Sequence, residues 1–129
     1  MRKFNTAGPC VEKKHYMVPA ESRLPEIPQL VADEAYVVVH APRQTGKTTT
    51  LRALAKKITT EGDIAALHFT CEIGQAAGDD YGAAERMIWR SILRAARGAL
   101  PEELQPPEAV DSEPGSYLLD NLTLWAEVC

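Results

Sequence analysis

Apolar and polar positions follow two different periods along the first half of the chain. A short β-branched run, Tyr36-Val37-Val38-Val39-His40, is bounded by loop residues and predicts a strand buried on both faces. Further along the chain, apolar residues recur at helical spacing, which predicts an amphipathic helix that ends at Gly62. Its apolar positions are Leu51, Leu54, Ala55 and Ile58. A second apolar run over 64–70 predicts another strand, so this order indicates a βαβ unit with parallel strands.

The second half of the chain has a helical pattern on either side of a polar segment. Apolar residues at helical spacing predict a helix from about Tyr81 to Leu100, which Pro101 closes. Residues 101–115 combine prolines with several acidic residues, a composition that predicts a loop or flexible linker. A third helix is expected from about Ser116, with Leu118, Leu122 and Trp125 on one face.

These elements predict an α/β fold, with four segments along the chain. Residues 1–35 form an extended, proline-containing lead-in with a short helix near Pro28 to Glu34, and residues 36–100 form a βαβ core with the second helix. The linker 101–115 and a last helix over 116–129 follow. The domain is expected to be truncated after this last helix.

Composition narrows the class of protein. With 129 residues, 45% of them hydrophobic, the chain has the material for one modest globular domain. Its net charge of -4 gives no global attraction to nucleic acid, so no nucleic-acid partner is expected, and no apolar run is long enough for a membrane span. Three widely separated cysteines, without a C-x-x-C spacing, fit neither a disulfide framework nor a zinc site and favour a cytoplasmic location.

The segment Ala41 to Thr48 carries the most specific motif. It reads Ala41, Pro42, Arg43, Gln44, Thr45, Gly46, Lys47, Thr48. It fits the phosphate-loop pattern G-x-x-x-x-G-K-[ST] at every fixed position except the first, where Ala41 replaces glycine. The predicted strand before it and helix after it are the context that such a loop needs, whereas a chance Gly-Lys-Thr at a helix start is the alternative.

Each fixed position of this loop has a chemical role toward a nucleoside triphosphate. Gly46 allows close approach of the backbone to phosphate oxygens, Lys47 places a positive charge near the β- and γ-phosphates, and the Thr48 hydroxyl would coordinate magnesium. Backbone amides from about Gln44 to Thr49 would surround the β-phosphate. The expected ligands are therefore ATP and Mg²⁺.

The stretch YVVVHAPRQTGKTTTLRAL, residues 36–54, resembles the AAA-like ATPase domain of bacterial ATP-binding proteins, in the AAA/STAND branch of P-loop NTPases. Residues 4–9 and 15–19, with Arg23 beyond, are similar to the segment that precedes the loop in that family. The resemblance implies a three-layer α/β/α fold with a parallel sheet, an ATP-driven switch, and protein partners. It also makes His15 and Tyr16 candidates for adenine contacts, although packing of a loop aromatic is the simpler interpretation.

The acidic groups that hydrolysis needs are missing from the sequence. ATPases of this class place an acidic pair at the end of a second apolar strand, to hold magnesium's water shell and polarise the attacking water. Asp111 and Asp120 follow apolar residues, but neither ends a four-residue strand and neither precedes a second acid. Binding without hydrolysis is therefore expected, from the N-terminal part of a longer ATPase domain with no assignable catalytic residue.

Two further groups of residues have alternative interpretations. One side of the second predicted helix is lined by Arg86, Arg90, Arg94 and Arg97. These arginines would bind a phosphate backbone or an acidic partner. The alternative is a solvated helix face, with Glu85 and the acidic linker as counter-charges. The group 68–72, with a histidine, a cysteine and a glutamate, suggests a metal site but fits a strand end better.

The competing functions are a non-catalytic protein-interaction module that retains the loop and a small P-loop kinase. The kinase would need a phosphoacceptor pocket and an arginine-rich lid.

Overall fold

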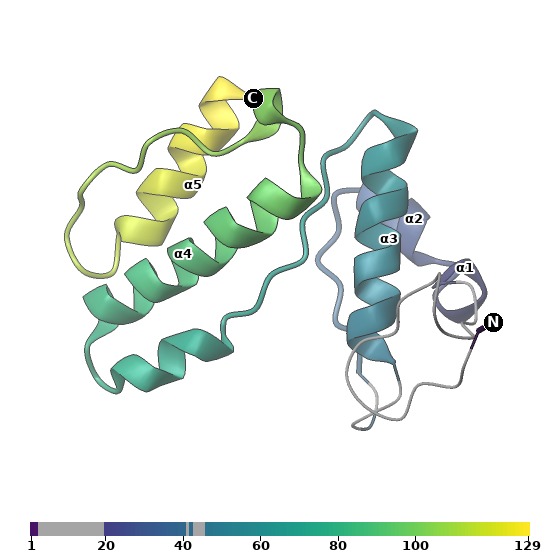
Figure 1. Ribbon diagram of the computed structural model, residues 1–129, viewed down its shortest axis with the longest axis horizontal. Coiled ribbons are helices and arrows are strands. Elements are labelled where there is room, and N and C mark those ends of the chain that lie inside the picture. The colour runs from purple at the N-terminus through teal and green to yellow at the C-terminus, as the bar shows by residue number, and fades with distance from the viewer. Residues whose placement is uncertain (3–19, 41, 43–45) are drawn as a thin grey trace. The chain divides into compact units, whose positions relative to one another are not determined.

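A computed structural model describes residues 1–2, 20–40, 42 and 46–129, and it divides the chain into two compact units (Figure 1). Unit 1 spans Met1–Ala66 and unit 2 spans Leu67–Cys129. In unit 1 the helices are α1 (Ala20–Arg23), α2 (Ile27–Ala32) and α3 (Lys47–Glu61). In unit 2 they are the 3-10 helix η1 (Glu72–Ala77), α4 (Tyr81–Ala99), the 3-10 helix η2 (Glu102–Leu104) and α5 (Tyr117–Val128).

The predicted α/β fold with a parallel sheet is wrong, because the described residues contain helices and no strand. The run 36–40, expected to be buried on both faces, leaves Tyr36 107% and Val38 90% exposed. A parallel strand is stable only when neighbours pair its backbone and helices cover both faces. The runs 36–40 and 64–70 have the side chains of strands, but no such pairing forms in the described structure.

The predicted helices are confirmed. The short helix expected near Pro28 is α2, the helix after the loop is α3, the helix expected from about Tyr81 to Leu100 is α4, and the one from about Ser116 is α5. Each needs only local periodicity and local end signals. Gly62 ends α3 in the left-handed conformation, with φ of 93°, and Asp80 begins α4 by accepting a hydrogen bond from the Ala83 N–H at 2.9 Å.

Unit 1 is organised around α3, which packs against α1. Leu54 and Thr50 are the buried side chains of α3, only 3% and 5% exposed. The chain after Gly62 returns along the end of the helix, because the Thr59 hydroxyl accepts from the Ala66 N–H at 2.9 Å and also contacts the Ala66 carbonyl. Both groups of Ala66 are therefore held without a strand partner.

Unit 2 has its core between η1, α4 and α5. Trp89, Ile92 and Tyr117 are its buried members, and Trp125 packs against them. The indole rings of Trp89 and Trp125 meet edge to face, with centroids 6.3 Å apart and planes at 86°. Trp89 thus lies inside the core, and Trp125 covers it as a partly buried neighbour.

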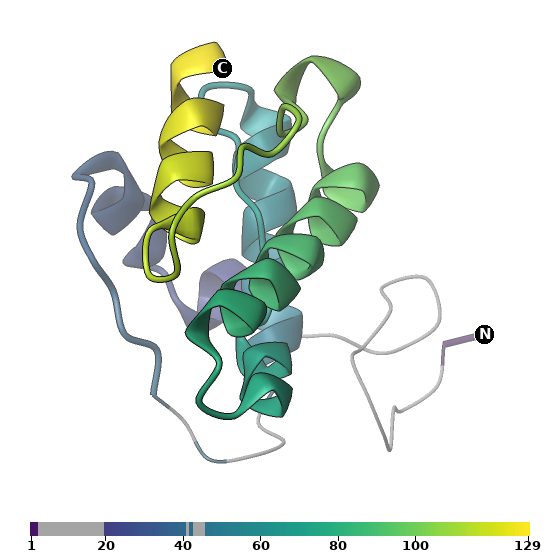
Figure 2. The same cartoon turned by 90° about the vertical axis from the view of Figure 1, so that its left-hand side faces the viewer.

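Figures 1 and 2 show α4 and α5 running in the same direction, so residues 100–116 return the chain along them. We call residues 105–115 the return segment. Polar side chains fix it at both ends and in the middle. Gln105 donates to the Leu100 carbonyl at 2.6 Å and to the Ala96 carbonyl at 2.9 Å, so its amide occupies carbonyls at the end of α4.

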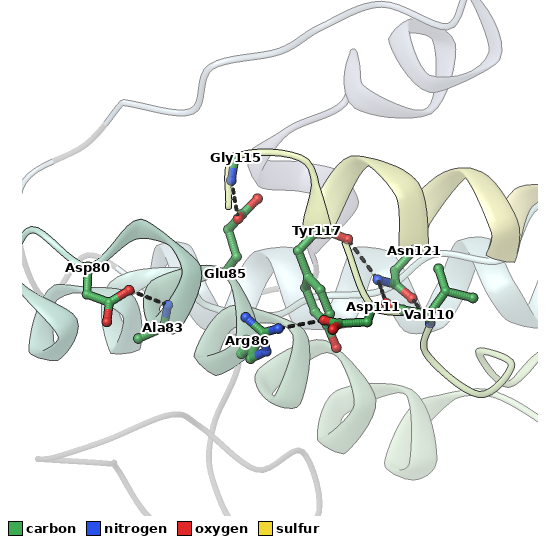
Figure 3. A network of polar contacts seen from close by, with 9 residues as sticks. All are labelled: Asp80, Ala83, Glu85, Arg86, Val110, Asp111, Gly115, Tyr117 and Asn121. Atoms are coloured by element: carbon green, nitrogen blue, oxygen red, sulfur yellow. Dashed lines mark hydrogen bonds and ion pairs between the residues drawn. The ribbon is translucent and has the colours of Figure 1, made fainter. Parts of the chain in front are cut away.

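The middle of the return segment is held by Asn121, which is only 1% exposed (Figure 3). Its side-chain oxygen accepts from the Val110 N–H at 2.8 Å, and its amide donates to the Val110 carbonyl at 3.0 Å and to the Tyr117 carbonyl at 2.8 Å. One buried amide thus satisfies both backbone groups of Val110, as a neighbouring strand would.

Glu85 and Arg86 of α4 contact the last part of the return segment and the start of α5 (Figure 3). The Glu85 carboxylate accepts from the Gly115 N–H at 2.7 Å and from the Leu118 N–H at 3.3 Å, which places a negative charge at the start of α5. Arg86 forms an ion pair with Asp111 at 2.6 Å, and its guanidinium lies 4.9 Å from the centroid of the Tyr117 ring.

Candidate phosphate-binding site

The motif residues that the structure describes meet at the start of α3. Gly46 is the residue that precedes the helix, and Lys47, Thr48 and Thr49 form its first turn. The first bond of the helical ladder joins the Thr50 N–H to the Gly46 carbonyl at 2.9 Å, so the amides before Thr50 lie at the positive end of the helix dipole. This first turn contains no acidic residue.

Gly46 has the backbone that glycine favours. Its φ of 84° and ψ of 19° lie in the left-handed region, which other residues adopt at a cost. The space beside it is also filled, because a Cβ atom at this position would lie 2.5 Å from Nη1 of Arg23. The left-handed backbone is therefore what favours glycine here, whereas the flexible end of the Arg23 side chain could move aside for a Cβ atom.

Arg23 is a functional candidate that the loop motif did not identify. Its Nη1 donates to the Thr50 hydroxyl at 3.2 Å, a contact that spans 27 residues of sequence. The guanidinium of α1 therefore lies beside Gly46 and the first turn of α3, on the same helix end as Lys47. A guanidinium offers several N–H donors in a fixed plane, a geometry suited to phosphate oxygens.

The other predicted site residues are placed as follows. Pro42 is exposed and lies outside the helix, whereas Ala41, Arg43, Gln44 and Thr45 lie outside the described residues, as do His15 and Tyr16. Thr48 is exposed on α3. Over the described part of the chain no cluster of three or more histidine, cysteine, aspartate or glutamate side chains could hold a metal ion.

The arrangement can attract an anion. Arg23 and Lys47 carry two positive charges to the N-terminal end of a 15-residue helix, and backbone amides at such an end favour negative charge. Asp120, which was considered for the acidic pair of a hydrolytic site, is exposed on α5 in unit 2.

The chain was compared with protein-family models, with curated proteins and with solved structures, and none of them matches it. Among the helices that the structure describes, none is both long and apolar enough to cross a membrane.

Proposed function

We propose that this chain binds the phosphate chain of a nucleoside triphosphate, ATP with Mg²⁺, at the N-terminus of α3. One observation carries the proposal: Gly46, Lys47 and Thr48 form the start of a 15-residue helix in the order and place that the phosphate-loop motif requires. The contact is local. It uses a helix end and its flanking cations. The helix that the motif predicts after the loop is present, whereas the strand predicted before it does not form over the described residues 36–40.

The neighbouring Arg23 supports a highly charged ligand. Two cationic side chains at one helix end are better matched by the several negative charges of a triphosphate than by a single phosphate. The resemblance of residues 36–54 to AAA-like ATPase domains supports ATP as the nucleotide. Free, exposed Cys71 and Cys129 support a reducing, cytoplasmic location.

Calorimetric titration of the whole chain tests this function. ATP and inorganic triphosphate should bind with similar affinity, ADP more weakly, and AMP least, because the contacts are to phosphates. Lys47→Ala should remove binding. Lys56→Ala is the matched control, since it removes an exposed lysine from the middle of the same helix and should leave affinity unchanged.

Two results would refute the proposal. One is absence of heat at millimolar ATP with excess Mg²⁺, and the other is an equal loss of affinity in the Lys47→Ala and Lys56→Ala variants.

We expect negligible steady-state hydrolysis of ATP by this chain, because its sequence provides no acidic pair after an apolar strand. A phosphate-release assay with Mg²⁺ checks this. Turnover that disappears in Lys47→Ala would show that the chain contains a hydrolytic site, and phosphate transfer to a small molecule would favour a kinase.

A further inference from the structure

The exposed side of α4 carries a row of arginines. We call Arg90, Arg94 and Arg97 the arginine row. All three are exposed, and in the part of the chain that the structure describes they have neither an ion pair nor a hydrogen bond. Their i, i+4, i+7 spacing places them on one stripe of a rigid 19-residue helix.

The same stripe already binds a carboxylate at its N-terminal end. Arg86 precedes the row by one turn, and its guanidinium holds Asp111 of the return segment at 2.6 Å (Figure 3). The residues around Asp111, 105–115, are not helical until the turn that leads into α5, and they lie beside α4. The chain itself therefore shows how an acidic, non-helical segment is received by this side of the helix.

We propose that the arginine row binds an extended acidic segment of a partner protein, with one carboxylate for each arginine. The helical rise separates Arg90 from Arg94 by about 6 Å and Arg94 from Arg97 by about 4.5 Å along the axis. Carboxylates on alternate residues of an extended chain are about 6.7 Å apart. This spacing exceeds that of the arginines by about 1 to 2 Å, and the long, flexible arginine side chains can span the difference. Each guanidinium can donate two parallel hydrogen bonds to one carboxylate.

An acidic peptide fits this surface better than a nucleic acid does. A nucleic acid would bring many phosphates against a chain whose net charge is -4, and the row offers only three cations to offset them. A short peptide presents few charges. The internal ligand of the stripe, Asp111, is also a carboxylate.

Fluorescence anisotropy with the full chain tests the proposal. The probe is a labelled Asp-Ala-Asp-Ala-Asp peptide at low ionic strength, and its neutral twin is Asn-Ala-Asn-Ala-Asn. Arg94→Gln should weaken binding about twofold to fivefold, the effect of one exposed ion pair. Arg90→Gln with Arg94→Gln should lower affinity further. Arg52→Gln with Lys56→Gln is the matched control, since it removes the same charge from exposed positions of α3.

The expected result is binding of the acidic peptide only, clearly weakened in the α4 double variant, kept in the control, and abolished by raised salt. Equal losses in the two double variants, or equal binding of the neutral peptide, would overturn the proposal. So would tighter binding of a single-stranded oligonucleotide of the same charge, which would identify a nucleic-acid surface. A salt-sensitive dimer in sedimentation, lost in the α4 double variant, would overturn it in favour of a second copy.

Discussion

Replacing Asn121 by leucine should loosen the return segment from α5. Asn121 is 1% exposed and makes three hydrogen bonds, two of them with the backbone groups of Val110. Leucine has a similar size and cannot make them. The bond to the Tyr117 carbonyl is the least important, because that carbonyl also lies one turn before the Asn121 N–H in the helix.

The expected loss of stability depends on how exposed each backbone group is that loses its hydrogen bond to Asn121. A net hydrogen bond contributes about 0.5 to 1.5 kcal/mol, and a buried group left unpaired costs about 1 to 3 kcal/mol. Val110 is 45% exposed, so water can replace part of what its backbone loses. We expect Asn121→Leu to lower the free energy of unfolding of unit 2 by about 2 kcal/mol, a fall of roughly 10 °C in melting temperature for a unit of this size.

Urea denaturation followed by tryptophan fluorescence measures this effect selectively. The two tryptophans of the chain, Trp89 and Trp125, both lie in unit 2. The midpoint should fall by about 1 to 2 M with little change in slope. Thr123→Ala is the control, because residue 123 is exposed on the same helix and should shift stability by less than about 0.5 kcal/mol. A midpoint for Asn121→Leu as close to wild type as the control would refute the reasoning.

Three further substitutions test other contacts. Gly46→Ala should destabilise unit 1 by about 1 kcal/mol, because alanine would have to adopt a left-handed backbone; an unchanged thermal transition in far-UV circular dichroism would contradict this. Glu85→Gln should cost unit 2 about 0.5 to 1 kcal/mol by weakening a charge-assisted cap of α5, an effect that urea denaturation at neutral pH would detect and that added salt should reduce. Asp80→Ala should cost about 1 kcal/mol through loss of the bond from the Ala83 N–H, and Asp79→Ala, one residue earlier, should show no comparable loss of tryptophan-monitored stability.

The helices could be predicted from sequence because their signals are local. The apolar spacing of Leu51, Leu54 and Ile58, and the stop at Gly62, act within a few residues of one another. The strand predicted over residues 36–40 was wrong. β-Branched side chains favour a strand, but a strand forms only when a neighbouring strand pairs with its backbone. A run of this composition is compatible with pairing and does not create it.

The candidate site likewise contains residues that a local motif predicts and one residue whose contact is distant in sequence. Gly46, Lys47 and Thr48 were found because their spacing is fixed within one loop and one helix start. Arg23 was not identified by the motif, because its contact with Thr50 crosses 27 residues and no periodic signal links the two. The return segment is similar: its composition predicts a loop, whereas the buried amide that holds Val110 comes from an asparagine that a helical pattern treats as merely polar.

Glu85 makes α5 dependent on α4 for its own helicity. Ser116 precedes α5 but provides no side-chain cap, and the amides of Gly115 and Leu118 are satisfied instead by a carboxylate some thirty residues away. A helix of 12 residues is marginal alone in water. A synthetic peptide of α5 should therefore be mostly unfolded, and the helix should form only as it docks. The surface of α4 thus supplies both the packing face and the capping carboxylate that α5 lacks in its own sequence.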